Sequence, residues 1–248
     1  MNWLRIVRAE MHKLTSTKMP LAFLTVFVVI GAVTAVAVAY GTDMDGSKTF
    51  ISTALDQQSL MAFATNSVVI AALFGTIAVA REYGHGTVVL TFLTTPRRSQ
   101  AVLAQLAAIF AAGCALGLIG AGVSAGSVAI GLTATDYGFM VSAGDLVRVL
   151  AASALAGGAG AVLGGGIGTL VRNTGGAVTG TILLLIILPP LAVQMASETA
   201  SWVPNTLANV MSGIDPSVGV GAAIAAILAW AIVPATVALG AVLRRDVV

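Results

Sequence analysis

Residues 21–40 read LAFLTVFVVIGAVTAVAVAY, a run of 20 residues without a single charged side chain. A helix rises about 1.5 Å per residue, so this run is long enough to cross the roughly 30 Å hydrocarbon core of a bilayer. The sequence therefore predicts an all-α, polytopic membrane protein with about six transmembrane helices. The five further runs lie at about 59–80, 101–130, 149–171, 177–197 and 218–243.

Composition excludes a water-soluble fold, because 58% of the 248 residues are apolar and only 9% are charged. An ordinary soluble domain carries roughly 25% charged residues. No stretch has the composition of a separate soluble domain, so residues 1–248 are expected to form a single transmembrane domain. The basic residues are spread over helix ends rather than gathered in one patch, which gives no support for nucleic-acid binding.

The chain shows no constellation typical of an enzyme or a metal site. Cys114 is the only cysteine, so neither an intramolecular disulfide nor a cysteine metal cluster can form. The two histidines, His12 and His85, are far apart and lack metal-ligand spacing. We therefore expect a protein that is not an enzyme and has no catalytic residues, metal or cofactor of its own.

The basic residues predict the orientation, since Lys and Arg are retained on the cytoplasmic side of short loops. With the N-terminus inside, only Lys48 and Arg148 of the twelve Lys and Arg residues lie outside. We expect a multi-pass protein of the cell inner (plasma) membrane with both termini cytoplasmic. The first apolar run exceeds the roughly 7 to 15 residues of a cleavable signal peptide, so it should stay in place. The ten cytoplasmic basic residues are Arg5, Arg8, Lys13, Lys18, Arg81, Arg97, Arg98, Arg172, Arg244 and Arg245.

Residues 1–18 have the pattern of an amphipathic helix lying on the membrane surface. The basic residues of its polar side can each gain about 1 kcal/mol from an anionic leaflet. Glu10 is the exception, because it falls on the apolar side. The helix is either a simple membrane anchor or a lever that also contacts a cytosolic partner. Its apolar side holds Trp3, Leu4, Ile6, Val7, Met11 and Leu14, and its polar side Arg5, Arg8, His12 and Lys13.

Residues 81–100, REYGHGTVVLTFLTTPRRSQ, form the longest charged loop that this orientation places in the cytoplasm. Two glycines permit a sharp turn after the second span, and Thr87 can cap a short helix over residues 88–93. Pro96 then closes that helix. A short, stiff helix at this position suits force transfer from a docked protein, although the loop could also be only a basic topology anchor.

Glu82, the pair Gly86-Thr87, the short apolar helix and Pro96-Arg97-Arg98 together resemble the loop of ABC type-2 exporter permeases, the membrane subunits of ATP-driven exporters. The resemblance extends to the amphipathic start, the six spans and the length. It implies a coupling helix seated in a groove of the ATPase subunit and a connecting helix beside it. The implied docking residues are Glu82, Tyr83, Gly86, Thr87, Phe92, Pro96, Arg97 and Arg98, with Trp3, Arg5, Arg8 and Lys13 on the connecting helix.

The resemblance also implies the partners: ABC ATPase subunits, and a second permease chain in a homodimer or a related heterodimer. A phosphate-binding loop with a Gly-Lys-Ser/Thr core is absent from the sequence, so ATP and Mg would bind the partner ATPase. The implied cargo is a hydrophobic or amphipathic drug, peptide or lipid. Ion-coupled transport is the main alternative, but it usually needs ionisable residues at membrane depth, and the six runs contain essentially none. A structural membrane protein is the third possibility.

Three further local patterns concern helix packing and helix ends. Gly157, Gly160, Gly164 and Gly168 recur at helical spacing and predict either a groove for close helix packing or a flexible element of a gate. Pro189 and Pro190 should kink or end the fifth span. Residues 191–216 are too polar for a clean span. They form either short re-entrant helices at the outer mouth, as the resemblance implies, with Trp202 at the membrane interface, or a partly ordered external loop.

Overall fold

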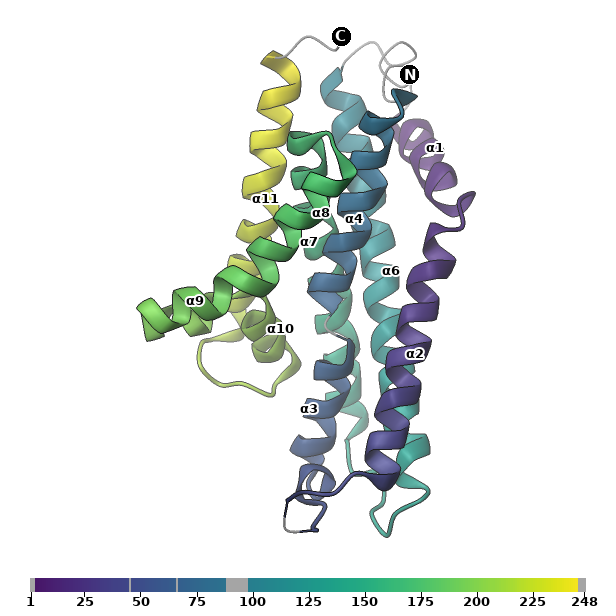
Figure 1. Cartoon of the computed structure of the whole chain (residues 1–248), viewed down its shortest axis with the longest axis vertical. Helices are drawn as coiled ribbons and strands as arrows, with labels where there is room; N and C mark the ends of the chain where they lie inside the picture. The colour runs from purple at the N-terminus through teal and green to yellow at the C-terminus, as the bar shows by residue number, and fades with distance from the viewer. Residues whose placement is uncertain (1–2, 45, 66, 88–97, 245–248) are drawn as a thin grey trace.

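The computed structural model describes residues 3–44, 46–65, 67–87 and 98–244. Every regular element within these ranges is helical, and six segments are long and apolar enough to cross a membrane (Figure 1). The predicted all-α fold with six spans is therefore confirmed. The elements are α1 (Trp3–Thr15), α2 (Met19–Tyr40), η1 (Thr49–Ile51), α3 (Ala54–Thr65), α4 (Ser67–Gly84), α6 (Arg98–Leu132), α7 (Ala143–Val171), α8 (Thr174–Ile182), η2 (Leu183–Ile187), α9 (Leu188–Met195), η3 (Ser197–Trp202), α10 (Pro204–Ser212) and α11 (Val220–Arg244).

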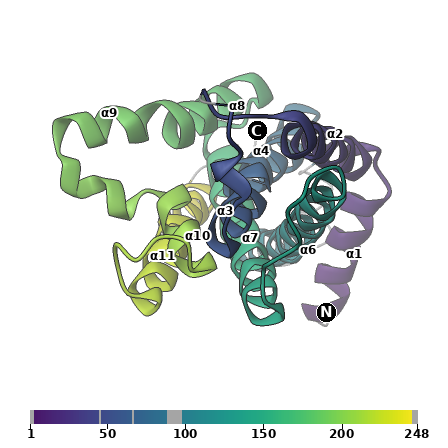
Figure 2. The same cartoon turned by 90° about the horizontal axis from the view of Figure 1, so that it is seen from below.

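The second span covers α3 and α4, which lie on either side of Asn66, a residue outside the described ranges. The fifth span is composite and consists of α8, the π-helical η2 and α9. Pro189 and Pro190 stand in the first turn of α9. Proline has no N–H to donate to the preceding turn, which accounts for the wider π turn just before them. α9 then extends away from the bundle, and all of its residues are at least partly exposed (Figures 1 and 2).

α7 is the central helix of the bundle and packs against α4, α6 and α11 (Figure 2). Small residues allow this close approach. A Cβ added at Gly164 would collide with the carbonyl oxygen of Ala72 in α4, and one added at Gly157 would lie 2.5 Å from the carbonyl oxygen of Gly113 in α6. Gly160 and Gly168 also face α4. The glycine series thus divides between two neighbouring helices rather than forming one face.

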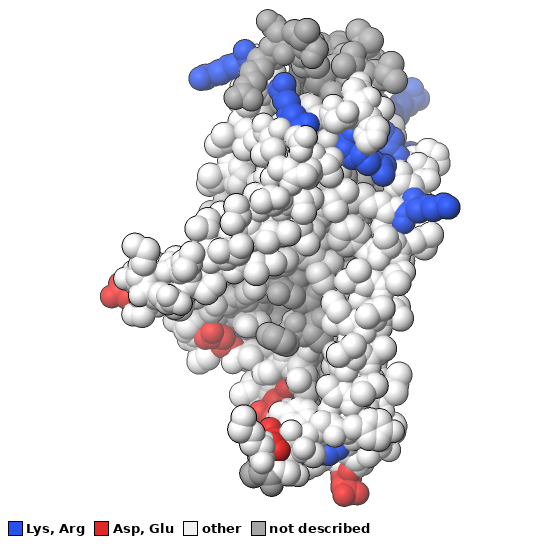
Figure 3. All heavy atoms as spheres, in the orientation of Figure 1, with Lys and Arg blue, Asp and Glu red and all other residues white. Residues whose placement is uncertain are grey.

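Charges separate toward the two ends of the bundle (Figure 3). The start of α1, the end of α4, the end of α7 and the end of α11 share the upper end, where the Lys and Arg side chains gather; we call it the basic end. The carboxylates in this view lie in the lower half, whose extremity we call the acidic end. The charged residues of the six spans all lie in the first or last two turns.

Four described residues have a charge opposite in sign to the charges that gather at their end of the bundle. The side chains of all four form bonds within the protein. Lys48 and Arg148, at the acidic end, donate to carbonyl groups at helix C-termini. Nζ of Lys48 lies 2.6 Å from the oxygen of Ala39 in α2, and Nε of Arg148 lies 3.0 Å from that of Met211 in α10. The last carbonyls of a helix lack partners and carry partial negative charge, so cations suit them. Glu10 and Glu82, at the basic end, belong to the site described below.

Residues 197–212 form the short helices η3 and α10 rather than an unstructured loop. Leu207, Val210 and Met211 are buried where α10 packs against α7 and α11. Nε1 of Trp230 in α11 donates to the carbonyl oxygen of Trp202 at 3.0 Å, which ties the end of η3 to the sixth span.

Candidate functional site at the basic end

The amphipathic helix α1 packs against the N-terminal part of α6. Its most deeply buried residues are Ile6 and Glu10, at 5% and 4% exposure. Trp3, Arg5 and Arg8 are exposed on the rest of the helix. Glu10, the residue that broke the apolar pattern in the sequence, is therefore one of the two buried residues of α1.

A polar cluster joins three helices at this point. Nζ of Lys13 lies 2.7 Å from Oε1 of Glu10, one turn earlier in α1, and 3.3 Å from Oε1 of Glu82 in α4. The amide nitrogen Nε2 of Gln105 in α6 donates to Oε2 of Glu82 at 3.0 Å. Both oxygens of Glu82 are thus engaged, one by α1 and the other by α6. We call Glu10, Lys13, Glu82 and Gln105 the polar cluster.

The polar cluster is partly withdrawn from water, since the side chains of Glu10 and Glu82 are 5% and 17% exposed and that of Lys13 is 41% exposed. Burial raises the pKa of the Glu10 carboxyl, and the nearby charge of Glu82 raises it further. The hydrogen bond and positive charge of Lys13 lower the pKa but do not cancel the effect of burial. The carboxyl groups of Glu10 and Glu82 therefore share the ammonium group of Lys13, and the carboxamide of Gln105 lies beside them.

The chain turns immediately after Glu82. The hydroxyl of Thr87 donates to the Glu82 carbonyl oxygen at 3.2 Å, and Gly86 has a φ of +69°, a left-handed conformation that favours glycine. α4 extends to Gly84, so Glu82 and Tyr83 lie on its last turn rather than in a loop as expected. The segment that leaves α4 therefore starts from a residue held by both α1 and α6.

Tyr83 contacts a second cation on the neighbouring helix. The Arg172 guanidinium carbon lies 5.3 Å from the centre of the Tyr83 ring, a cation–π distance. Arg172 is the C-terminal cap of α7, with a φ of +58°. Within the described residues, the Tyr83 hydroxyl and Nε and Nη2 of Arg172 are buried without a hydrogen-bond partner.

A hollow of about 470 Å³ opens between the end of α1, the start of α2 and the end of α4. Lys13 and Glu82 lie in its wall, together with Arg81, His85 and Thr87. This concave surface at the basic end, which combines charged and apolar side chains, is large enough to receive side chains of another protein.

The structure brings some of the predicted docking residues together and leaves others undescribed. Lys13, Glu82 and Thr87 share the hollow, whereas the ring of Tyr83 contacts Arg172 at the end of α7. Arg98 begins α6. Phe92, Pro96 and Arg97, like the predicted helix over 88–93, lie outside the described residues.

Sequence reasoning did not include three residues of this region among the docking residues. Glu10 was noticeable as a carboxylate on an apolar helix face, and Gln105 as a rare amide inside a span. Both are signals of a buried partner, because polar groups in apolar surroundings need one. Arg172 gave no such signal, since it reads as one more basic residue at a helix end.

Comparison with known proteins leaves the function to be argued from the structure. No family model matches this chain, and no curated protein matches it either. The polar cluster and its position in the fold therefore carry the functional argument.

Proposed function

We propose that this chain is the membrane subunit of an ATP-driven exporter of the ABC type-2 class. The observation that carries the proposal is the polar cluster. It links an amphipathic helix, α1, to the end of the second span at the point where a charged segment leaves the bundle. A protein that receives force from outside the bilayer needs such a rigid connection at its surface.

Charge placement supports the same proposal. The described charges of the spans are confined to the helix ends, so the middle of each span carries no charged side chain among the described residues. A transporter driven by bound ions usually keeps ionisable groups at membrane depth. The energy for transport would then enter at the basic end, which in this proposal faces the cytoplasm of the cell inner membrane.

The mechanism follows from the contacts of Glu82. Two ATPase subunits, which hold ATP and Mg, would dock against residues 81–98 and the hollow beside α1 in a dimer of permease chains. Their closure would displace the end of α4. Because Glu82 bonds to Lys13 of α1 and Gln105 of α6, these helices would move with α4 and tilt the bundle between inward-open and outward-open states. The cargo in this proposal is a hydrophobic or amphipathic molecule, such as a drug, peptide or lipid.

Copurification tests the proposal. A Walker-type ATPase encoded beside this chain should copurify with it, and the ATPase activity should rise in the complex. Glu82→Ala removes both links from α4, and Gly86→Trp places a bulky side chain at a left-handed turn, so each should weaken ATPase binding. Glu198→Ala is the matched control, because Glu198 is an exposed carboxylate in η3, the element that follows α9 away from the basic end. Unchanged ATPase binding and activity in the first two variants would refute the docking assignment.

A further inference from the structure

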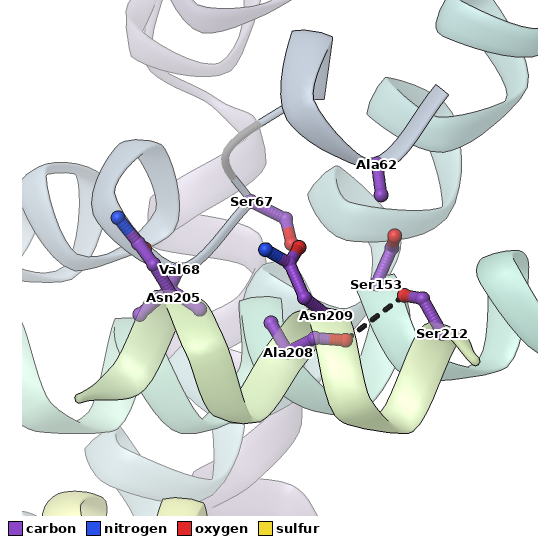
Figure 4. Close-up of a pocket in the computed structure, with 8 residues that line it drawn as sticks. All are labelled: Ala62, Ser67, Val68, Ser153, Asn205, Ala208, Asn209 and Ser212. Carbon is purple, nitrogen blue, oxygen red and sulfur yellow. Dashed lines mark hydrogen bonds between the residues drawn. The ribbon is translucent and has the colours of Figure 1, made fainter. Parts of the chain in front are cut away.

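A small polar pocket lies between α10 and the junction of α3 with α4 (Figure 4). Its volume is about 130 Å³. Three helices far apart in the sequence supply its polar side chains. These are Ser67 at the start of α4, Ser153 of α7, and Asn205, Asn209 and Ser212 of α10.

Most of these polar groups are left without a partner. Ser67 and Ser153 are each only 5% exposed. Among the described residues, neither hydroxyl forms a hydrogen bond, and neither do the side-chain amides of Asn205 and Asn209. Ser212 alone is satisfied, by donating to the Ala208 carbonyl oxygen at 2.9 Å. In Figure 4 the side chains of Ser67, Ser153 and Asn209 are directed into the same space.

Three buried threonines of the bundle behave differently, whereas Ser124 of α6, at 2% exposure, has no hydrogen-bond partner among the described residues either. Thr76, Thr169 and Thr181 each donate to the carbonyl oxygen four residues earlier in their own helix, at 2.8, 2.9 and 3.0 Å. Ser153, in the middle of a regular helix, could do the same but faces the pocket instead. A buried polar group without a partner costs about 1–3 kcal/mol. Two such residues, Ser67 and Ser153, face one cavity beside the partly exposed Asn209, which indicates a site that is completed by a ligand.

The lining determines what kind of group fits. Its described side chains are hydroxyls, carboxamides and small apolar groups, none of which carries a formal charge. A buried ion would lack a countercharge here, which makes its binding costly. Hydroxyls and carboxamides both donate and accept hydrogen bonds, so they suit an uncharged amide or hydroxyl. A cavity of 130 Å³ is well below the roughly 300–1,000 Å³ of a site for a drug-sized molecule, so it suits a head group.

The position of the pocket indicates how a ligand reaches it. Ser67 lies near the middle of the span Ala54–Gly84, and Asn205 is exposed on the surface of the bundle. The pocket is therefore accessible at membrane depth. We propose that it binds the uncharged hydrogen-bonding head group of an amphiphile dissolved in the membrane, whose apolar tail stays outside the pocket.

Binding at this pocket requires neither an ATPase nor transport, so it can be tested on the full-length chain alone. The probe is radiolabelled N-decylacetamide, added to the protein in phosphatidylcholine nanodiscs. Decyltrimethylammonium and decanoate, with equal chains and charged heads, serve as competitors at equal membrane concentrations. The variants are Ser153→Ala and Asn209→Leu, and size-exclusion chromatography checks their folding. Ser59→Ala is the control, because the Ser59 hydroxyl bonds to the Leu55 carbonyl oxygen and lies outside the pocket.

We expect saturable binding that each pocket variant weakens about threefold to tenfold, the loss corresponding to one hydrogen bond. Ser59→Ala should bind like the wild type, and the charged amphiphiles should compete at least tenfold less well than unlabelled N-decylacetamide. Binding that does not saturate, equal competition by all three head groups, or wild-type affinity in a correctly folded Ser153→Ala protein would each overturn the proposal. None of these results would bear on ATPase docking.

Discussion

Nζ of Lys13 lies 3.3 Å from Oε1 of Glu82, across 69 residues of sequence, and this contact joins the surface helix α1 to the second span. Gln105 holds the other oxygen of Glu82, and Glu10 holds the other side of Lys13. A carboxylate bonded from two sides at a helix end fixes the direction in which the chain leaves that helix. The polar cluster thereby sets the geometry of the surface that we propose as the ATPase-docking site.

Lys13 and Glu82 should be energetically coupled. We expect Lys13→Met and Glu82→Gln to destabilise the protein together by less than the sum of their separate effects. The coupling free energy should be about 0.5–1 kcal/mol, because Lys13 is partly exposed and its ion pair is screened. A double-mutant cycle of chemical unfolding in detergent measures it. Strict additivity would show that the contact contributes nothing to stability.

Glu10 should make stability depend on pH. Because burial raises its pKa above the usual 4.5, the folded state holds the proton more tightly than the unfolded state. The charged carboxylate therefore destabilises the fold as the pH rises from about 4.5 through the raised pKa. Glu10→Gln should gain thermal stability relative to the wild type over this window and keep the gain at higher pH.

The measurement is the melting temperature of both proteins in the same detergent from pH 4 to pH 8. Glu198→Gln, at an exposed carboxylate, serves as the control and should show a smaller change with pH. A difference between Glu10→Gln and wild type that stays constant or falls as the pH rises would contradict the assignment.

The close approach of α4 and α7 should depend on Gly164. A methyl group there meets the backbone of Ala72, which cannot move without separating the helices, so Gly164→Ala should destabilise by about 1–3 kcal/mol. Gly122→Ala is the matched control, because nothing lies near the added methyl group in α6 and alanine favours a helix. Thermal unfolding compares them. Equal melting temperatures would mean that the α4–α7 contact tolerates the extra volume.

Much of the fold could be predicted from the sequence because length, hydropathy and charge are local properties. The number of spans and the gathering of basic residues at one end follow from them directly. The length of α4 could not be predicted, because its last turn carries charged residues that are typical of a loop.

The candidate site was predicted only in part, for a physical reason. Glu82 and Lys13 were identified separately, but their contact depends on how α1 lies against α6, which no local pattern encodes. Lys48 and Arg148 likewise appeared in the sequence only as basic residues on the side of the membrane where basic residues are rare. Their role becomes visible only when the helix ends that they contact are in place.

Arg148 should hold α10 in place. Its Nε and Nη2 donate to the carbonyl oxygens of Met211 and Val210 at 3.0 and 3.3 Å, and Gln58 donates to that of Ser212 at 2.6 Å. Arg148→Met removes the first two bonds and leaves C-terminal carbonyls of α10 unpaired. Because hydrogen bonds to charged groups contribute about 1.5–3 kcal/mol, we expect α10 to open locally before the bundle unfolds.

Hydrogen exchange read by mass spectrometry tests this, with faster exchange expected in peptides covering residues 203–214 and little change in α7. Arg148→Lys should restore part of the protection, because lysine keeps the charge but not the two-nitrogen geometry. Lys48→Met is the control: it removes the other cation of the acidic end, which bonds to Ala39 of α2, and should leave α10 unchanged. If α10 exchanges at the wild-type rate in Arg148→Met, packing of Leu207, Val210 and Met211 is sufficient to hold it, and the arginine is not its anchor.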